Sequence, residues 1–279
     1  MIIVIGATGP VGRSAISILR ESGHDVAAVT RDPAAARLPE GVRVVHADPS
    51  RPGALDAHWA GVDGVLLSPR ASGPEAANLL KTAAAHGVRR VAVISSATVV
   101  HPAGELRFAE GFKAAERAAE DSGLAWTHLR CADFASNTLA WAAQIPSGAV
   151  RGAYANAASS TVHERDIAAV AVKALTEDGH EGRAYVITGP ESLTQSRKAA
   201  LIGEAIGREI GFVELAPEQV RAAMLAQGLP EEIPARLLGS LADFAREAGP
   251  QTDTVARLLG RPALTFGQWA AEHASAFER

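Results

Sequence analysis

The chain opens with the stretch Met1-Ile2-Ile3-Val4-Ile5-Gly6-Ala7-Thr8-Gly9-Pro10-Val11-Gly12. The run from Ile2 to Ile5 is continuously apolar, which is typical of a parallel strand covered on both faces. Three glycines follow at intervals of three residues. This spacing permits a tight turn, a close approach of the backbone to a pyrophosphate, and close packing of the next helix on the strand. The phosphates would lie at the N-terminus of that helix, where free N–H groups favour negative charge. The stretch therefore predicts a dinucleotide site.

The composition argues against several kinds of partner. The 279 residues carry a formal net charge of -4, with a pI near 6.1 and no basic stripe, so nucleic acid is not an expected ligand. No apolar run approaches the roughly 18 residues that span a bilayer, so no membrane association is expected. The single cysteine, Cys131, excludes an internal disulfide. Because the sequence begins directly with a strand pattern, we expect a cytoplasmic protein without a signal peptide.

Strand and helix patterns alternate through the first half of the chain. We expect strands at residues 26–30, 42–46, 64–68, 91–95 and 125–130, with helices at residues 74–86 and 102–122 between them. Pro102 suits the first turn of the latter helix, and Gly123 suits its C-terminal end. Such alternation predicts an α/β fold with a doubly wound parallel sheet, the NAD(P)-binding Rossmann fold.

The second half of the chain departs from this alternation. It shows a helix at residues 164–176, a strand at residues 183–188, and mostly helix from residue 194 onward. We expect residues 1–150 to form an NADP-binding Rossmann domain, to whose sheet residues 163–190 return. Residues 191–279 would form a smaller, mostly helical domain that caps the substrate, and residues 151–162 an irregular crossing. The cleft between sheet and cap is the expected substrate site.

The end of the second strand distinguishes the two dinucleotides. In such folds an acid at this position binds the ribose 2′-OH of NAD, whereas an arginine accommodates the 2′-phosphate of NADP. Arg31 follows the strand directly, so we expect NADP(H) to be preferred over NAD(H). Asp32 could be the acid that binds NAD, but it precedes Pro33 and equally suits a helix N-cap. Arg13 is a possible second phosphate contact.

Ligands bind outside the carboxyl ends of parallel strands, which extends the predicted cofactor site. Asp48 would meet the adenine amino group or serve as a turn aspartate, and the ends of the fourth and fifth strands would face the ribose and nicotinamide. The predicted cofactor-binding residues are Gly6, Ala7, Thr8, Gly9, Pro10, Val11, Gly12, Thr30, Arg31, Asp48, Pro49, Ser68, Pro69, Arg70, Ser95 and Ser96.

Several motifs together resemble a known family. They are Gly6-Ala7-Thr8-Gly9-Pro10-Val11-Gly12-Arg13, Thr30-Arg31-Asp32-Pro33, Ser122-Gly123-Leu124-Ala125-Trp126-Thr127-His128-Leu129-Arg130, Glu164-Arg165-Asp166-Ile167-Ala168-Ala169-Val170-Ala171, Tyr185-Val186-Ile187-Thr188-Gly189-Pro190-Glu191 and Leu258-Leu259-Gly260-Arg261-Pro262. The chain resembles the short-chain dehydrogenase/reductase superfamily, in its atypical NmrA-like branch with triphenylmethane reductases and NAD(P)H-dependent quinone or azo reductases. One departure is Cys131, where relatives usually carry proline.

The resemblance implies that one part of the usual machinery is missing. Most of the superfamily reduces carbonyls with a tyrosine and a lysine four residues apart, and neither Tyr154 nor Tyr185 has a lysine at that spacing. If Glu116 is the glutamate that usually follows the lysine by four, the two positions hold Phe108 and Phe112. Such a site should favour acceptors that are already electrophilic, namely quinones, enones, iminium ions or cationic dyes, with protons supplied by water.

The remaining candidate residues concern substrate and catalysis. Aromatic side chains could line an apolar substrate pocket or belong to the core; the pocket residues are Phe108, Phe112, Phe134, Asn137 and Trp141. Catalytic candidates are Lys113, Asn137 and His101. We expect no metal, since His163, Glu164 and Asp166 are too close in sequence to converge on one ion. Cys131 is expected to be a small buried hydrophobe.

Two functions of different classes fit these observations. The first is an NADPH-dependent reductase of a small aromatic or conjugated molecule, acting as a monomer or homodimer. The second is a non-catalytic NADP(H)-sensing regulator, like NmrA, that binds a protein partner. An isomerase or dehydratase that keeps its dinucleotide bound is a third. Consumption of the cofactor would distinguish the enzyme from the sensor.

Overall fold

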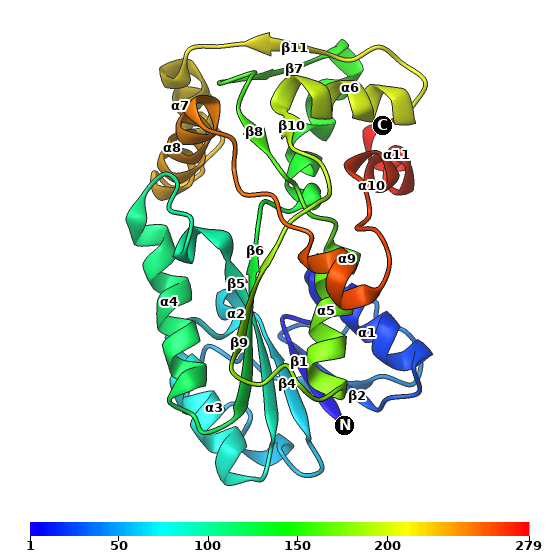
Figure 1. Ribbon diagram of the computed structural model, residues 1–279, viewed down its shortest axis with the longest axis vertical. Coiled ribbons are helices and arrows are strands. Elements are labelled where there is room, and N and C mark those ends of the chain that lie inside the picture. Colours follow the sequence, from blue (N-terminus) through cyan, green and yellow to red (C-terminus); the bar gives the residue numbers. More distant parts are fainter. Residues whose placement is uncertain (279) are drawn as a thin grey trace. The chain divides into compact units, whose positions relative to one another are not determined.

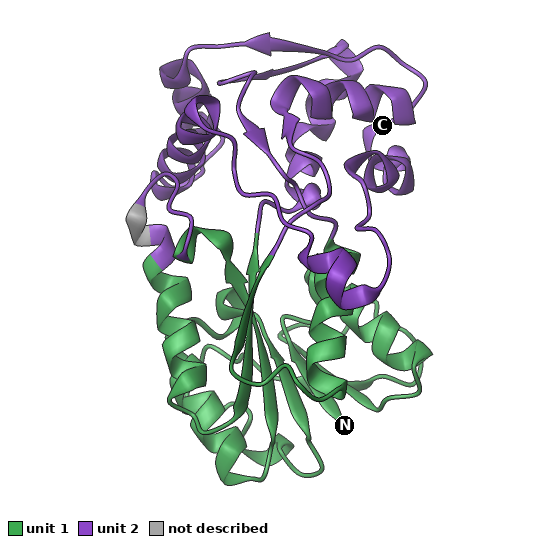
Figure 2. Ribbon diagram, in the orientation of Figure 1, with its two compact units in different colours: residues 1–99, 110–131, 164–186 green, residues 100–109, 132–163, 187–279 purple. Residues whose placement is uncertain are grey.

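The computed structural model describes residues 1–278, apart from the side chains of Leu106 and Arg107. The chain divides into two compact units (Figure 2). Unit 1 consists of residues 1–99, 110–131 and 164–186, and unit 2 of residues 100–109, 132–163 and 187–279. Each unit has a hydrophobic core of its own, as expected of a separate structural unit.

Unit 1 is built on a seven-stranded sheet. Its strands are β1 (Ile2–Ile5), β2 (Val26–Thr30), β3 (Arg43–His46), β4 (Gly64–Leu67), β5 (Arg90–Ser96), β6 (Ala125–Cys131) and β9 (Arg183–Ile187), in the order β3-β2-β1-β4-β5-β6-β9. Neighbouring strands from β3 to β6 pair in parallel. The chain changes direction across the sheet between β1 and β4. The carboxyl ends of these two strands therefore form the crevice at which such sheets bind ligands.

Helices cover both faces of this sheet (Figure 1). Helices α1 (Pro10–Glu21) and α5 (Glu164–Thr176) pack against each other on one face, and α3 (Ala76–Ala85) and α4 (Leu106–Glu120) lie on the other. Along β1, Ile3 and Ile5 join Leu79 and Leu80 of α3 in one core cluster. Burial of both faces explains why the first strand is apolar without interruption. The predicted doubly wound fold is confirmed.

Short elements complete unit 1, and unit 2 is mixed. Unit 1 also contains α2 (Pro69–Ser72), η1 (Asp56–His58), η2 (Gly73–Glu75) and η3 (Ala97–Val99). Unit 2 contains η4 (Ala135–Ser147), β7 (Ala149–Gly152), β8 (Ala158–Ser159), β10 (Leu193–Thr194), α6 (Gln195–Ala205), β11 (Gly211–Glu214), α7 (Pro217–Ala226), α8 (Glu232–Arg246), α9 (Thr254–Leu259), α10 (Phe266–Glu272) and α11 (Ala274–Phe277). Strand β11 pairs in parallel with β7, and β10 pairs antiparallel to β8. The core of unit 2 gathers around Trp269, which stacks on Phe266 and meets Phe277 edge-on.

Two local expectations were wrong. Helix α4 begins at Leu106, so Pro102 lies outside its first turn. Gly104 adopts a left-handed backbone, φ +66, and its N–H donates to Asp243, which prevents a helix from running through it. Residues 151–162 are not irregular throughout, since they contain β8 and the end of β7. The C-terminal part is mostly helical as predicted, and it also contains the strand β11.

The boundary between the two parts also differs from the expected one near residue 150. After Cys131 the chain leaves the sheet, and residues 135–147 pack into the core of unit 2 with α6 and α10. Residues 164–186 return to unit 1, close to the predicted return at residues 163–190. The assignment of residues 191–279 to a substrate cap stays a prediction. None of the described helices has the length and apolarity needed to cross a membrane.

Candidate functional site

The glycine turn connects β1 to α1, and its geometry explains why glycine stands at positions 6, 9 and 12. Gly6 has φ +100, and a Cβ there would lie 2.6 Å from the Cβ of Ser68. A Cβ on Gly12 would lie 2.2 Å from the carbonyl oxygen of Gly6, so α1 can approach β1 this closely only without a side chain. A Cβ on Gly9 would be less crowded, at 3.3 Å from the same oxygen. Glycine at position 9 thus fits the predicted approach of a pyrophosphate better than it fits a packing need.

The start of α1 carries free donors. Gly9 is the N-cap residue and provides no side-chain cap, and Pro10 occupies the first helical position. The N–H of Arg13 is the first to reach a helical acceptor, the carbonyl of Gly9 at 2.9 Å. The N–H groups of Val11 and Gly12 therefore lack an acceptor within the helix. The first turn has no acidic residue, so the positive end of the helix dipole is not neutralised.

The turn after β2 separates the roles of Arg31 and Asp32. Oδ1 of Asp32 accepts the N–H of Ala35 at 3.1 Å, and the N–H of Asp32 donates to Oγ1 of Thr30 at 3.2 Å. Asp32 thus caps a turn at residues 33–35, and it is not the helix N-cap that its sequence equally suited, because no helix follows it. The side chain of Arg31 is exposed, and its carbonyl lies 3.1 Å from Nε2 of His46.

Arg13 links the glycine turn to the loop after β2. Its Nε donates to the carbonyl of Thr8 at 3.0 Å, and its Nη1 donates to the carbonyl of Arg37 at 3.3 Å. Arg37 has φ 45, an uncommon value for a residue with a side chain. The guanidinium of Arg13 therefore braces two backbone segments of the predicted cofactor site.

Asp48, at the end of β3, stabilises its own turn. Its Oδ1 accepts both the N–H of Ser50 at 3.1 Å and the Ser50 hydroxyl at 2.7 Å. These hydrogen bonds, together with the nearby charges of Arg31 and Arg51, hold the pKa of Asp48 below its ordinary value. Pro49 beside it is buried. The turn role of Asp48 is thus present in the structure, and contact with adenine stays a prediction.

The ends of β4 and β5 use their serines differently. Ser68 packs against Gly6, Pro69 begins α2, and Arg70 is exposed. The hydroxyl of Ser95 donates to Oε1 of Glu116 at 2.5 Å, inside the core. The Ser96 hydroxyl lies 2.8 Å from that of Thr98. Both β5 hydroxyls are thus engaged within the protein, which leaves the main chain as the part of β5 offered to a ligand.

Glu116 anchors the end of β5 and β6 to α4. Glu116 is only 4% exposed. Arg130 donates hydrogen bonds to both of its carboxylate oxygens, from Nε to Oε1 at 3.0 Å and from Nη2 to Oε2 at 2.7 Å. Burial alone would raise the pKa of Glu116, but the hydrogen bonds from Arg130 and Ser95 outweigh it and lower the pKa. The carboxylate therefore stays charged inside the core.

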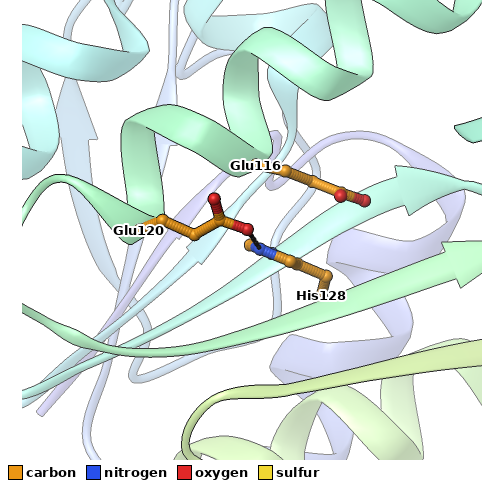
Figure 3. A group of neighbouring side chains, drawn as sticks. All are labelled: Glu116, Glu120 and His128. Carbon is orange, nitrogen blue, oxygen red and sulfur yellow. Dashed lines mark hydrogen bonds and ion pairs between the residues drawn. The ribbon is translucent and has the colours of Figure 1, made fainter.

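A histidine extends this network (Figure 3). His128 on β6 is fully buried, stacks on Trp126 at 4.3 Å, and places Nε2 3.0 Å from Oε1 of Glu120. Burial lowers its pKa, so its neutral form is favoured. Glu116, Glu120 and His128 offer ligand atoms within 4.8 Å of one another. Because Arg130 occupies both oxygens of Glu116, this geometry suits an ion pair better than a metal ion.

The predicted catalytic and pocket residues have varied surroundings. Lys113 pairs with Glu110 on the same helix at 2.9 Å, and His101 is exposed. Asn137 is exposed and donates to Asp133. Of the predicted pocket residues, Phe112 belongs to unit 1, and Phe108, Phe134, Asn137 and Trp141 belong to unit 2.

Two of these aromatic rings have partners within unit 2. Trp141 packs against the unit 2 core and meets Phe212 edge-on, with 6.2 Å between the ring centroids. This agrees with the alternative that the Trp141 ring belongs to the core. The guanidinium of Arg236 lies 4.3 Å above the ring of Phe108. Cys131 is buried, and burial raises the pKa of its thiol, as expected of an unreactive core residue.

Sequence reasoning did not single out Lys198, which is fully buried on α6. Gln195, Ala199 and Ile202 form the buried face of that helix, and Lys198 falls on the same face. A lysine at an apolar-face position is a detectable signal, because lysine is almost never fully buried without a partner. The helical spacing could therefore have identified it.

Comparison with known proteins extends this picture. Residues 6–178 match the family described as NAD(P)H-binding. The chain belongs to this NAD(P)H-binding family. It is 39% identical to a (4-alkanoyl-5-oxo-2,5-dihydrofuran-3-yl)methyl phosphate reductase of Streptomyces griseus, over 99% of both chains. It is 35% identical to an NAD(P)H azoreductase of Xenophilus azovorans, again over 99% of both.

A solved structure agrees with these relatives. An NADPH-dependent quinone oxidoreductase of Escherichia coli superimposes with a TM-score of 0.82 at 28% identity, covering 98% of this chain and 99% of that one. The predicted relationship to quinone and azo reductases is confirmed. The chain is therefore an NAD(P)H-dependent reductase.

The crowding at Gly12 gives a direct test of the site in this reductase. Gly12→Ala would force α1 away from β1, because its Cβ would fall 2.2 Å from the Gly6 oxygen. We expect the dissociation constant for NADPH to rise by about tenfold or more, as for loss of one hydrogen bond to a charged group. Fluorescence titration measures it. Gly111→Ala, on α4 with open space at its Cβ, is the matched control and should bind normally; equal affinity for both variants would contradict the assignment.

The Glu116 pair predicts a pH-dependent stability. Glu116→Gln leaves the partly buried Arg130 without its anion, so the free energy of unfolding at pH 7 should fall by about 3 kcal/mol. Because folding lowers the pKa of Glu116 from 4.5, its contribution is present above that pH and is lost as the pH falls below it.

Urea unfolding of wild type and variant at pH 7 and pH 4 tests this expectation. The difference between the two proteins should be smaller at pH 4. Glu110→Gln, which breaks an exposed pair, should change stability by less than about 1 kcal/mol. A Glu116→Gln variant as stable as wild type at pH 7 would show that the pair contributes little.

Proposed function

We propose that the protein transfers a hydride from NADPH to a small conjugated acceptor whose carbon is already electrophilic, such as a quinone, an enone, an iminium ion or a related dye. The observation that carries the proposal is the absence of a tyrosine and lysine pair at the spacing used for carbonyl reduction. Tyr185 bonds through its hydroxyl to Nδ1 of His180 at 2.9 Å, and Tyr154 has no lysine four residues on. If Glu116 is the glutamate that usually follows the lysine by four, Phe108 and Phe112 stand at the tyrosine and lysine positions on α4.

The class of acceptor follows from the absence of the tyrosine and lysine pair. A simple ketone needs an acid that protonates its oxygen as the hydride arrives. A conjugated acceptor spreads the incoming charge over its π system, so proximity and orientation supply most of the acceleration. The names of the relatives describe an unsaturated lactone phosphate, azo compounds and quinones, all of which accept a hydride in this way. These substrates support the acceptor class and not one particular molecule.

The residues around the glycine turn would hold the cofactor. The free N–H groups of Val11 and Gly12 would bind the pyrophosphate, and Arg31 would bind the 2′-phosphate of NADPH. Asp32 is engaged as a cap, which favours recognition of a phosphate by Arg31 over recognition of a ribose hydroxyl by Asp32. When bound, the dihydronicotinamide supplies the hydride. The protein orients it and excludes competing reactions.

The preference for NADPH can be tested at Arg31. Arg31→Ala removes a charge-assisted bond to the 2′-phosphate, so the dissociation constant for NADPH should rise by about tenfold or more, while that for NADH changes little. Titration with both cofactors measures the ratio. Lys81→Ala, an exposed cation on α3, serves as the control. Equal losses for NADPH and NADH would remove the assignment.

The acceptor class can be tested with a panel. Purified protein with NADPH is offered a quinone, an azo dye, a conjugated enone or butenolide, and a simple aliphatic ketone, and the loss of NADPH absorbance is followed. We expect turnover with at least one conjugated acceptor and none with the ketone. Binding of NADPH without turnover of any acceptor would contradict the proposal and favour the NADP(H)-sensing regulator instead.

A further inference from the structure

Arg13, near the start of α1, joins two parts of the predicted cofactor site within unit 1. Its Nε donates to the carbonyl of Thr8 in the glycine turn at 3.0 Å, and its Nη1 donates to the carbonyl of Arg37 in the loop after β2 at 3.3 Å. The residue is exposed, so these hydrogen bonds rather than burial define its place. One guanidinium thus bridges the predicted pyrophosphate site and the loop that carries Arg31.

The first part of this loop, residues 31–37, is held from β3. Nε2 of His46 on β3 lies 3.1 Å from the carbonyl of Arg31, and because a carbonyl only accepts, Nε2 is the donor. The carboxylate of Asp32 accepts the N–H of Ala35 at 3.1 Å, which closes the turn that follows Arg31. These contacts fix where the loop begins.

The other end of this turn is held from α1. Ala36 is buried, and Arg37 next to it has φ 45, a left-handed value that a residue with a side chain keeps only where its surroundings hold it. The hydrogen bond from Nη1 of Arg13 to the Arg37 carbonyl provides such a hold. The turn that begins at Arg31 is therefore fixed at both ends, by β3 and by α1.

We propose that Arg13 is a positioning residue for recognition of the 2′-phosphate of NADPH. By holding the Arg37 carbonyl, it keeps residues 31–37 in the conformation in which Arg31 binds that phosphate. The inference rests on the proposed function, which assigns the phosphate to Arg31. Nε and Nη1 of Arg13 donate to backbone carbonyls, so its part is to support the loop. Because NADH lacks the 2′-phosphate, Arg13 controls the preference between the two cofactors.

The bridge requires an arginine. A guanidinium carries donors on three nitrogens in a fixed plane and can reach two carbonyls at once, whereas a lysine offers a single nitrogen with the same charge. A loop that is already ordered loses less conformational freedom when its ligand binds, so the bridge lowers the dissociation constant for NADPH. Loss of the bond to Thr8 would weaken both cofactors alike. The ratio of the two dissociation constants therefore isolates the effect on the Arg31 loop.

The first test measures the dissociation constants for NADPH and NADH by fluorescence titration. Arg13→Lys keeps the charge but not the bridge, so the preference for NADPH should fall by about fivefold, as for the loss of one hydrogen bond. Arg20→Met is the matched control and should keep the wild-type preference. Arg20 is an exposed arginine of the same helix, and it lies at the far end of the same loop, where a Cβ on Gly41 would be 2.7 Å from its Nη2. A wild-type preference in Arg13→Lys would overturn the inference.

A double variant separates positioning from direct contact with the phosphate. In Arg31→Ala the side chain that Arg13 positions is absent. Adding Arg13→Lys to Arg31→Ala should therefore change the remaining preference by less than about twofold, since residues that act through one another are not additive. A further fivefold loss would show that Arg13 acts independently of Arg31 and would overturn the inference.

Hydrogen exchange tests the bridge without any cofactor. In the cofactor-free full chain, the amides of residues 31–38 should exchange faster in Arg13→Lys than in wild type or in Arg20→Met. Unchanged exchange in Arg13→Lys would overturn the inference.

The outcomes also distinguish this inference from the proposed function. A wild-type protein that binds NADPH and NADH equally would defeat the assignment of Arg31, and this inference with it. A wild-type protein that prefers NADPH, together with an Arg13→Lys variant that keeps the preference, would overturn this inference alone. Failure of the wild-type protein to reduce any acceptor would overturn hydride transfer, and the binding ratios would still decide the role of Arg13.

Discussion

The close contact between the start of α1 and the end of β1 governs the rest of the cofactor site. A hydrogen in place of a side chain at Gly12 lets the helix lie against the Gly6 carbonyl, where a Cβ would be 2.2 Å away. That contact fixes the free N–H groups at the start of α1 beside the carboxyl end of β1, the strand that borders the switch between β1 and β4. Ser68 at the end of β4 packs against Gly6, so the same turn also fixes the neighbouring strand end. One backbone constraint thus shapes the phosphate end of the site.

The other strand ends depend on buried polar contacts. Glu116 on α4 accepts hydrogen bonds from Ser95 on β5 and Arg130 on β6, and these bonds connect both strands to the helix. Burying the Glu116–Arg130 pair costs desolvation free energy. The bidentate hydrogen bonds from Arg130 and the hydrogen bond from the Ser95 hydroxyl offset this cost. Because these groups bond to one another, the edge of β5 offers backbone rather than hydroxyls. We therefore propose that the cofactor is held by main-chain donors with arginines around them.

The sequence could predict the sheet but not all of its surroundings. Apolar runs marked the strands, and β2 and α5 fall on the predicted residues. Strand β2 is buried at every position, and most of α5 is buried as well, so both carry a strong apolar signal. The start of α4 was missed because it depends on Gly104, whose left-handed backbone is fixed by Asp243, far away in the chain. The engagement of the Ser95 hydroxyl within the core could not be predicted, because its partner Glu116 lies 21 residues later. The partners of Lys198 could not be predicted either, since they come from β8 and the segment after β6, although helical spacing places the lysine itself on the buried face of α6.

In the proposed reaction the cofactor carries the chemistry and the protein orients it. Transfer of label tests this most directly. With NADPH deuterated at C4 and a conjugated enone, the product should carry one deuterium at the electrophilic carbon, from one face of the cofactor only. In D2O with unlabelled NADPH, that carbon should carry none. Solvent deuterium at the electrophilic carbon, or NADPH consumption without label transfer, would contradict direct hydride transfer.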